Sequence, residues 1–444
     1  MHRPTRRPTA SPTAARSAVL LAARSASRSA PLAAALTAAL LLSGCASTGG
    51  LPESDPADAS QVEVMTWWVS GPEYIGFSAV VDRFRSEHPD LKVLNSSVKG
   101  AGREDALAAL AARLEAGNPP DAYLAPGGEA LASFAGAVPL EDLSGFVDEH
   151  GLTGAVRPEL LELAAVDGTP SAVPVAVQRV NVLWSSVELL TAAGLDPADA
   201  PATIDDLLAD LQAVRASGIE YPLALGGGTA EVEFFESLLL AEAGADGYRA
   251  LLGEASWDTP AVRRAADQYL RLLDYAQPGF DRLAPSSAIR RVVDRKAAYA
   301  VGSDAAVQVF DSADRVYGAD YTAIPVPGTA GVYDAVVEVF ALPAERSHAD
   351  APLAWLETIA SADAQGDLAA ARSGIPVRSD APAAGSGTYQ QGAAASLAGD
   401  ELVPSIAHGI ALPPARTAGI LDAVARFGAD GRIEALITRL GGAQ

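Results

Sequence analysis

The stretch QVEVMTWWVSGPEY, residues 61–74, decides how this chain folds. Its first part, Gln61–Trp68, is rich in β-branched and aromatic residues, which predicts a β-strand. The strand ends in Trp67 and Trp68, two of the five tryptophans among 444 residues. Aromatic residues make up only 6 % of the chain, so two adjacent large rings need either a packing role or a binding role.

Strands and helices alternate after this stretch. A helix is predicted from the three-and-four spacing of its apolar residues, and it ends near His88 because the residue before a proline disfavours helical dihedrals. A strand at 91–98, a second helix and a short strand at 122–124 follow. The apolar positions of the two helices are Phe77, Val80, Val81 and Phe84, then Leu107, Leu110 and Leu114. This βαβαβ order predicts a parallel sheet, whose ligands bind beyond the carboxyl ends of its strands. Trp67 and Trp68 stand at such an end.

A second α/β region is predicted from residue 172 onward. Ala172–Trp184 is long and extended, as expected of a chain that crosses between two lobes. Thr203 is the expected N-cap of one helix, and Thr259-Pro260 opens another. Two more extended runs, at 297–302 and 336–342, interrupt the helical second half. Three crossings between two α/β regions predict two lobes with a hinge between them. We expect the other tryptophans, Trp184, Trp257 and Trp355, to pack in the interior.

The first 44 residues have the composition of an export signal. They carry six arginines and no acidic residue, followed by a short apolar run at 31–42. That run is shorter than the ~20 apolar residues that a membrane span needs. Cys45, the single cysteine, comes directly after Leu42-Ser43-Gly44, as in a bacterial lipoprotein signal that is cleaved before a lipidated cysteine. A chance cysteine in an ordinary signal is the alternative. Residues 45–60 are small, polar and rich in Pro and Gly, which predicts a flexible tether.

The charge balance excludes one class of partner, and the motifs disfavour several kinds of chemistry. Beyond residue 44, 26 basic residues face 55 acidic ones, so the chain lacks the basic footprint of a nucleic-acid-binding protein. It has no HExxH, GxSxG, CxxC or P-loop pattern, and its histidines lack metal-ligand spacing. We expect no metal and no cofactor. A glycosidase that uses two carboxylates stays open, because 55 acidic residues make any one pair uninformative.

Several segments, taken in order, resemble a known family. The lipoprotein signal, the strand ending in WW, NPPDAY at 118–123, VPVAVQRVNVLW at 173–184 and ARSGIPVRSD at 371–380 are similar to bacterial ABC-transporter solute-binding proteins of the carbohydrate class. The resemblance spans residues 60–440 and is greatest to the glucose-binding group. It implies a periplasmic-binding-protein-like fold of type II, with two lobes, each a central sheet flanked by helices, joined by a three-segment hinge. Hinge closure on a sugar, which is then passed to a membrane permease, is the implied mechanism.

The same resemblance implies the site residues. Trp67 and Trp68 match rings that flank the sugar, and Glu73 matches an acidic ligand to its hydroxyls. Gln178 stands where the group has a histidine, Arg372 where it has a lysine, and His408 matches a sugar-contacting histidine. Ser303 and Asp304 follow Gly302 where the group has Gly-Asp-Trp, so the aspartate is displaced. Leu124 and Pro126 replace polar side chains, which leaves the identity of the sugar undetermined.

Each of these residues also has a structural alternative. Adjacent strand residues point to opposite faces, so we expect one tryptophan to pack and the other to contact ligand. His408 would be structural without the matching segment around it, and Arg372 could form a surface ion pair. Glu73 is one acid among 55.

From the sequence we therefore expect an extracytoplasmic receptor rather than an enzyme. It would be a monomer that is held at the membrane only through Cys45. The expected parts are a signal peptide at 1–44, a tether at 45–60, lobe one at 61–173 plus 303–338, and lobe two at 177–299 plus 342–444. The rival functions are a surface glycosidase-like lipoprotein and a sugar-sensing or adhesive lipoprotein on the same fold.

Overall fold

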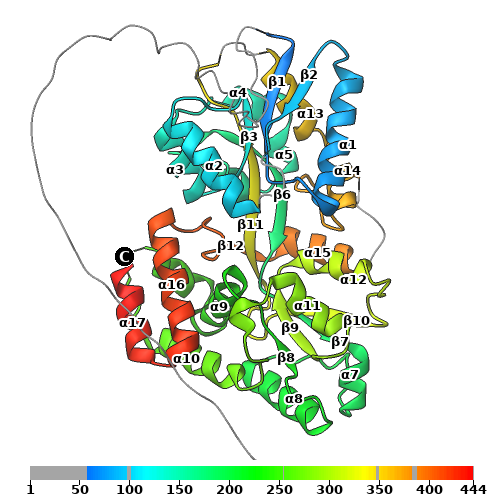
Figure 1. Cartoon of the computed structure of the whole chain (residues 1–444), viewed down its shortest axis with the longest axis vertical. Coiled ribbons are helices and arrows are strands. Elements are labelled where there is room, and N and C mark those ends of the chain that lie inside the picture. Colours follow the sequence, from blue (N-terminus) through cyan, green and yellow to red (C-terminus); the bar gives the residue numbers. More distant parts are fainter. Residues whose placement is uncertain (1–57, 98–101, 254, 347–349, 383–387, 444) are drawn as a thin grey trace, which may run out of the picture. The chain divides into compact units, whose positions relative to one another are not determined.

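The computed structural model describes residues 58–97, 102–253, 255–346, 350–382 and 388–443. The expected signal peptide, Cys45 and most of the tether lie outside the described residues. Two large β-sheets, each flanked by helices, account for most of the described chain (Figure 1). The expected two-lobe α/β class is confirmed.

The first sheet has six strands arranged around the long strand β11, which is yellow in Figure 1. Its order is β12-β11-β3-β1-β2, and β6 also pairs with β11. β1 is parallel to β2 and β3, as the βαβαβ pattern predicted, whereas β11 is antiparallel to β3 and β6. The bounds are β1 (Gln61–Met65), β2 (Lys92–Asn95), β3 (Ala122–Pro126), β6 (Ala172–Arg179), β11 (Val332–Ala341) and β12 (Glu401–Pro404).

The second sheet has four strands in the order β10-β7-β9-β8. The expected crossing at 172–184 is seen as two strands, because β6 belongs to the first sheet and β7 to the second. A short hairpin, β4 (Ala165–Val166) with β5 (Thr169–Pro170), precedes that crossing. The bounds of the second sheet are β7 (Val182–Ser186), β8 (Leu223–Ala224), β9 (Tyr299–Gly302) and β10 (Tyr321–Pro325).

Helices form the rest of the described chain, and two predicted starts are confirmed. Thr203 caps α8 through a reciprocal pair of hydrogen bonds with Asp206, and Thr259 accepts a hydrogen bond from the Val262 N–H at the start of α10. The bounds in the first half are α1 (Gly71–Glu87), α2 (Arg103–Glu115), α3 (Glu129–Ala137), α4 (Ser144–Glu149), α5 (Leu152–Ala155), α6 (Pro158–Glu162), α7 (Val187–Ala192) and α8 (Ile204–Ala216). In the second half they are α9 (Thr229–Leu252), α10 (Pro260–Leu273), η1 (Phe280–Arg282), α11 (Pro285–Val293), η2 (Asp304–Ala306), α12 (Val307–Asp311), α13 (Asp350–Ala360), α14 (Ala362–Ala371), α15 (Thr388–Gly399), α16 (Pro414–Asp430) and α17 (Ile433–Gly442).

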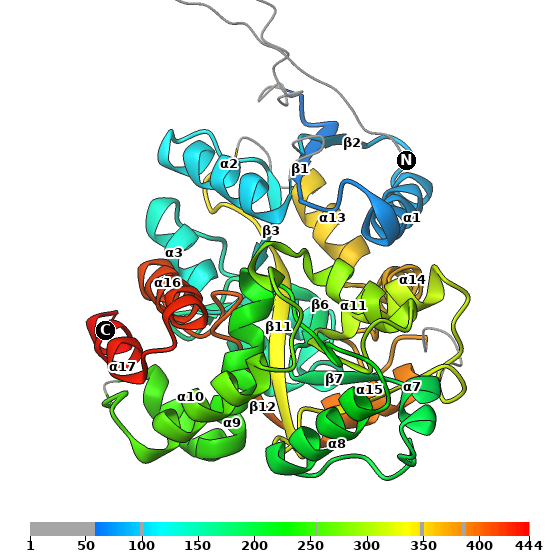
Figure 2. The ribbon, with the colours of Figure 1, turned by 60° about the horizontal axis from the view of Figure 1, so that its bottom comes forward.

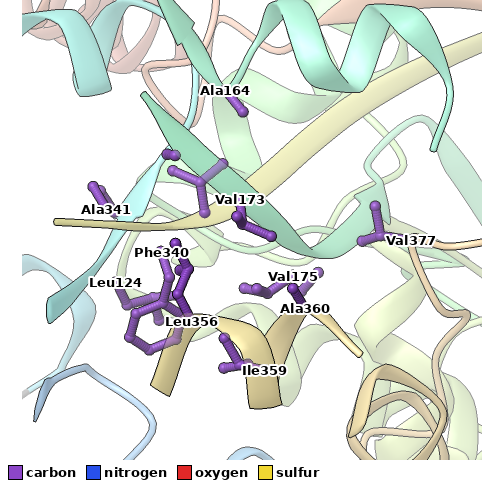
Figure 3. Packing of buried hydrophobic residues seen from close by; sticks show 14 of the residues in the cluster. Leu124, Ala164, Val173, Val175, Phe340, Ala341, Leu356, Ile359, Ala360 and Val377 are labelled. Carbon is purple, nitrogen blue, oxygen red and sulfur yellow. The ribbon is translucent and has the colours of Figure 1, made fainter. Parts of the chain in front are cut away.

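Two main hydrophobic cores stabilise these layers. The first core surrounds the six-stranded sheet and takes in α1, α13 and α14. Figure 3 shows its packing, with Leu356 and Ile359 of α13 lying against Leu124, Phe340 and Val175 of the strands. The second core joins α8, α9, α10, α16 and α17 to the four-stranded sheet, and the last four of these helices lie together in Figure 2. Trp184, Trp257 and Trp355 are all buried, as predicted.

The cores divide the chain differently from the expected lobe bounds. Residues 350–377, expected in lobe two, contribute to the first core, where Trp355 contacts the rings of Phe77 and Phe84 on α1. Residues 306–321, expected in lobe one, pack instead with Trp184 of the second sheet. The helix patterns predicted an apolar face for each segment but contained nothing that says which sheet would cover it.

The strand that opened the sequence ends earlier than predicted. β1 stops at Met65, because the Thr66 N–H donates to the Ser97 hydroxyl (3.0 Å) and the Trp68 N–H to the Thr66 hydroxyl (3.0 Å). These side-chain bonds replace the ladder bonds, so both tryptophans follow the carboxyl end of β1. Within the described ranges, no helix has the length and apolar character that crossing a membrane requires.

Candidate functional site

Trp67 and Trp68 differ in what surrounds them. Trp68 is fully buried, and its ring packs edge-to-face against Phe340 at 6.1 Å between centroids. The Arg372 guanidinium lies 5.1 Å from the same ring centroid. Trp67 retains 7 % exposure, its indole N–H donates to Glu338 Oε1 (3.3 Å), and the Arg103 guanidinium lies 5.4 Å from its ring centroid. Both rings belong to the first core and each lies near a guanidinium, but only Trp67 keeps some exposure and has its indole N–H bonded to a described residue.

Arg372 connects two carboxylates beside these rings. It follows the last residue of α14 and donates from Nη1 to Glu338 Oε2 (3.0 Å). Its Nη2 lies 3.5 Å from Glu73 Oε1, on the first turn of α1. Burial and the nearby Glu338 raise the pKa of Glu73 to about 7, against the opposing effect of Arg372 and Arg103. The structure thus brings four of the predicted site residues, Trp67, Trp68, Glu73 and Arg372, to one place around Glu338.

His408 joins this group through Arg103, a residue that no motif had singled out. Arg103 is the first residue of α2, and its Nη1 lies 2.7 Å from His408 Nδ1. Since a guanidinium can only donate, Nδ1 is the acceptor, and the ring proton is on Nε2. Nε2 then donates to Glu233 Oε1 (2.7 Å), on the first turns of α9. This chain of bonds fixes the neutral tautomer of His408.

Two nitrogens of Arg103, Nε and Nη2, are buried without a hydrogen-bond partner among the described residues, although the side chain as a whole is partly exposed. Arg372 Nη2 is in the same condition apart from its ion pair with Glu73. Burial lowers the pKa of Arg103 below its ordinary value, although the nearby carboxyl groups of Glu338, Glu73 and Glu233 act in the opposite direction. A buried N–H without a partner costs free energy, so these guanidiniums present donors to which a polar ligand can bind.

Gln178 and Asp304 also lie near Arg372. With Arg372 they line a cavity of about 20 Å³, roughly the space that one water molecule occupies. Burial raises the pKa of Asp304 to about 7, against the effect of a backbone hydrogen bond and of Arg372 and Arg179. Ser303 precedes Asp304, and among the described residues no hydrogen bond joins its hydroxyl to this cluster. Leu124, which replaces a polar residue of the resembled group, is buried in the first core.

Three residues of the cluster were missed by the sequence reasoning: Arg103, Glu233 and Glu338. Glu338 had a detectable signal, because it is a lone charge within the apolar run VVEVFAL, and a charge there requires a buried partner. Glu233 had a weaker signal, because it is an acidic residue that directly precedes two phenylalanines. Arg103 had none, since an arginine at a helix start is ordinary on a surface.

Comparison with known proteins places the chain among binding proteins. Residues 70–366 match the family described as bacterial extracellular solute-binding protein. An uncharacterized ABC transporter extracellular-binding protein of Pyrococcus horikoshii is 30 % identical over 87 % of this chain and 89 % of its own length. A probable sugar-binding periplasmic protein of Mesorhizobium japonicum is 28 % identical over 87 % of this chain and 94 % of its own.

A solved structure supports the fold assignment. A chitin oligosaccharide binding protein superposes with a TM-score of 0.74, covering 86 % of this chain and 97 % of that one. The two sequences are 20 % identical, so this likeness concerns the fold.

Proposed function

The chain belongs to the bacterial extracellular solute-binding protein family, and we propose that it captures a mono- or small oligosaccharide for an ABC importer. The observation that carries the proposal is the cluster described above, in which two guanidiniums, three carboxyl groups and an imidazole are linked to the Trp67 indole by direct or successive contacts. The sugar-binding relative and the sugar-binding structural neighbour support it.

The chemistry of this cluster suits a sugar. A pyranose has apolar C–H faces and a rim of hydroxyl groups, so an indole ring suits the face and charged groups suit the rim. Carboxylates accept from hydroxyls and guanidiniums donate to them. The two guanidiniums are balanced by the carboxylates of Glu338 and Glu233 and by the partly protonated Glu73. Because the cluster has no excess of positive charge, we propose a neutral sugar rather than an anionic one.

The two cores contribute opposite parts of the proposed site. Trp67, Arg103 and Arg372 come from elements of the first core, whereas His408 and Glu233 come from elements of the second. Capture by closure of two lobes requires such a division. We propose Trp67, Glu73, Gln178, Asp304, Arg372 and His408 as sugar contacts, with Ser303 at the margin and Trp68 supporting its neighbour.

The route to the membrane is also part of the proposal. Export would remove residues 1–44, and lipid on Cys45 would hold the chain at the outer face of the cytoplasmic membrane, with residues 45–60 as a tether. The chain would act as a monomer that delivers its sugar to permease subunits.

One observation favours a glycosidase as the second candidate. Burial and the nearby Glu338 raise the pKa of Glu73 to about 7, and an acid with a raised pKa close to a second carboxyl group is the pattern of glycoside hydrolysis. Against this, Glu338 is already bonded to Trp67 and Arg372. We therefore favour binding without turnover.

A sugar panel tests the proposal. The purified protein is titrated calorimetrically with D-glucose, D-galactose, D-xylose, maltose and cellobiose, with L-glucose as the enantiomeric control. A captured sugar should raise the free energy of unfolding by RT ln(1 + [L]/Kd), about 2.7 kcal/mol at a hundredfold excess over Kd. It should be recovered unchanged. Release of monosaccharide from maltose or cellobiose would favour the glycosidase. If no sugar of the panel gave a heat of binding or raised the free energy of unfolding, capture of these sugars would be overturned.

A further inference from the structure

Three buried glutamates lie close together on α9: Glu231, Glu233 and Glu236, none more than 5 % exposed. Glu231 accepts a hydrogen bond from the Tyr269 hydroxyl (2.7 Å), and Glu233 accepts from His408. Glu236 is the most deeply buried of them, and no cation among the described residues bonds it directly. Its role is not explained by the proposed sugar contacts.

Glu236 holds the backbone turn that carries His408. Its Oε1 accepts from the Ser405 hydroxyl (2.7 Å), and its Oε2 accepts from the backbone N–H groups of Ile406 (2.8 Å) and Ala407 (3.1 Å). The Tyr248 hydroxyl also approaches Oε2, at 3.4 Å. Glu236 therefore fixes residues 405–407 directly, and His408 follows in the chain.

A second buried acid, Asp334 on β11, faces Glu236. Asp334 is fully buried, and its carboxyl group lies beside that of Glu236. Neither of its side-chain oxygens has a donor among the described residues. Two ionised carboxylates side by side in the interior repel each other, so one of the two groups carries a proton. Glu236 already accepts from several donors, which leaves Asp334 as the protonated partner.

The surrounding charges agree with this assignment. Burial, Glu236 and Glu233 raise the pKa of Asp334 well above its ordinary value, and only Arg179 opposes them. Burial also raises the pKa of Glu236, to about 7, although the Ser405 hydroxyl and the Ala407 N–H favour its ionised form. Tyr248 faces the same pair with a pKa that burial raises, so its hydroxyl is neutral.

We propose that Asp334 donates a shared proton to Glu236, and that this carboxyl pair positions the 405–408 turn so that His408 meets Arg103. Both acids are positioning residues, since neither touches the proposed ligand. The consequence for sugar capture rests on the proposed function, whereas the shared proton and the turn geometry do not. Asp334 also lies on the same face of β11 as Glu338, four residues further on, so one strand supports both ends of the cluster.

The test compares Asp334→Asn with the unmodified protein. The side-chain amide of asparagine supplies a fixed N–H in place of the shared proton. We expect exchange protection of the Ile406 and Ala407 amides, corrected for intrinsic rates, to be within twofold of the unmodified protein at pH 7. As the pH rises through the raised pKa of Asp334, protection should fall more than tenfold in the unmodified protein and stay constant in the variant. Asp210→Asn, on α8 and bonded to Tyr299, is the matched control and should keep the unmodified profile.

Glu236→Leu removes the acceptor at similar volume. It should speed exchange at both amides more than tenfold and abolish the fixed Nε2–H tautomer of His408 in ¹⁵N spectra, while Asp334→Asn keeps that tautomer. If Asp334→Asn does not fold, a pH titration followed by ¹³C spectra of aspartate-labelled unmodified protein decides, because Asp334 should keep a protonated carboxyl signal after the other aspartates have lost theirs. The absence of that signal would overturn the proposal. So would the same pH profile of amide protection in the unmodified protein and in Asp334→Asn, or a tenfold lower protection of the Ile406 and Ala407 amides in Asp334→Asn at pH 7. None of these readouts requires a sugar.

Discussion

At the residue scale, the two adjacent tryptophans have separable roles. Trp68→Ala removes a fully buried ring that packs against Phe340, and such a truncation should cost about 3–5 kcal/mol of folding free energy. Trp67→Ala should cost less stability and weaken the binding of the panel's best sugar by roughly tenfold or more, because a ring face and an indole N–H are lost. Urea unfolding and calorimetry measure the two effects. If Trp67→Ala and Trp68→Ala lost the same amount of stability and Trp67→Ala bound the sugar as tightly as the unmodified protein, Trp67 would not be a ligand-facing ring.

Glu73 makes the stability of the folded chain depend on pH. Its pKa is raised from an ordinary 4.5 to about 7, so the folded protein keeps this proton over a range in which the unfolded chain has lost it. The stabilising contribution is fully present below pH 4.5 and is lost as the pH rises to about 7. In Glu73→Gln, the decline in unfolding free energy over this window should be shallower than in the unmodified protein, as urea titrations at four pH values would show.

An exposed acid provides the opposite control. Arg263 lowers the pKa of Glu434, so its contribution is present at neutral pH and is lost as the pH falls below its ordinary value. Glu434→Gln should therefore flatten the acidic limb of the profile only. A Glu73→Gln profile parallel to that of the unmodified protein between pH 4.5 and 7 would contradict the raised pKa.

At the element scale, local patterns predicted most helices and strands but not their partners. Hydrophobic spacing located α1 and α2, and the Thr203 and Thr259 caps located α8 and α10, because each of these signals lies within one turn of the element. Nothing local could assign α13 and α14 to the first core, since an apolar face fits any sheet.

The site residues divide in the same way. The resemblance to the family identified Trp67, Glu73, Arg372 and His408 in advance. Arg103 and Glu233 enter the cluster through contacts between residues more than 150 positions apart in the chain, which no local pattern can indicate.

Strand β11 shows how one element can serve both cores. Its first residues pair with β12, which leads into the His408 turn, and its last residues pair with β3 and β6. Asp334 and Glu338 are acidic residues within this buried strand, and each meets a partner from a distant part of the chain. A buried polar group that must meet its partner restricts which packing is possible, so these two acids contribute to the register between distant segments.

At the scale of the whole molecule, the contact between Arg103 and His408 joins an element of the first core to one of the second. A charge-assisted hydrogen bond contributes about 1.5–3 kcal/mol, and Arg103 also offers two buried N–H groups to a ligand. If closure on a sugar uses this contact, Arg103→Ala should weaken sugar binding by roughly 10- to 100-fold, as the same free energy implies at 1.4 kcal/mol per decade. Calorimetry with the panel's best sugar measures the loss.

Two further variants make the Arg103 prediction specific. Arg103→Lys keeps the charge but loses the planar fork of donors, so it should recover only part of the affinity. Arg263→Ala, which removes an exposed arginine bonded to Asp258 and Glu434, should leave affinity unchanged. Tighter sugar binding in Arg103→Ala would reverse the interpretation, because Arg103 would then occupy the face of Trp67 that the sugar needs. The direction of this one change therefore decides whether the guanidinium over Trp67 binds the ligand or competes with it.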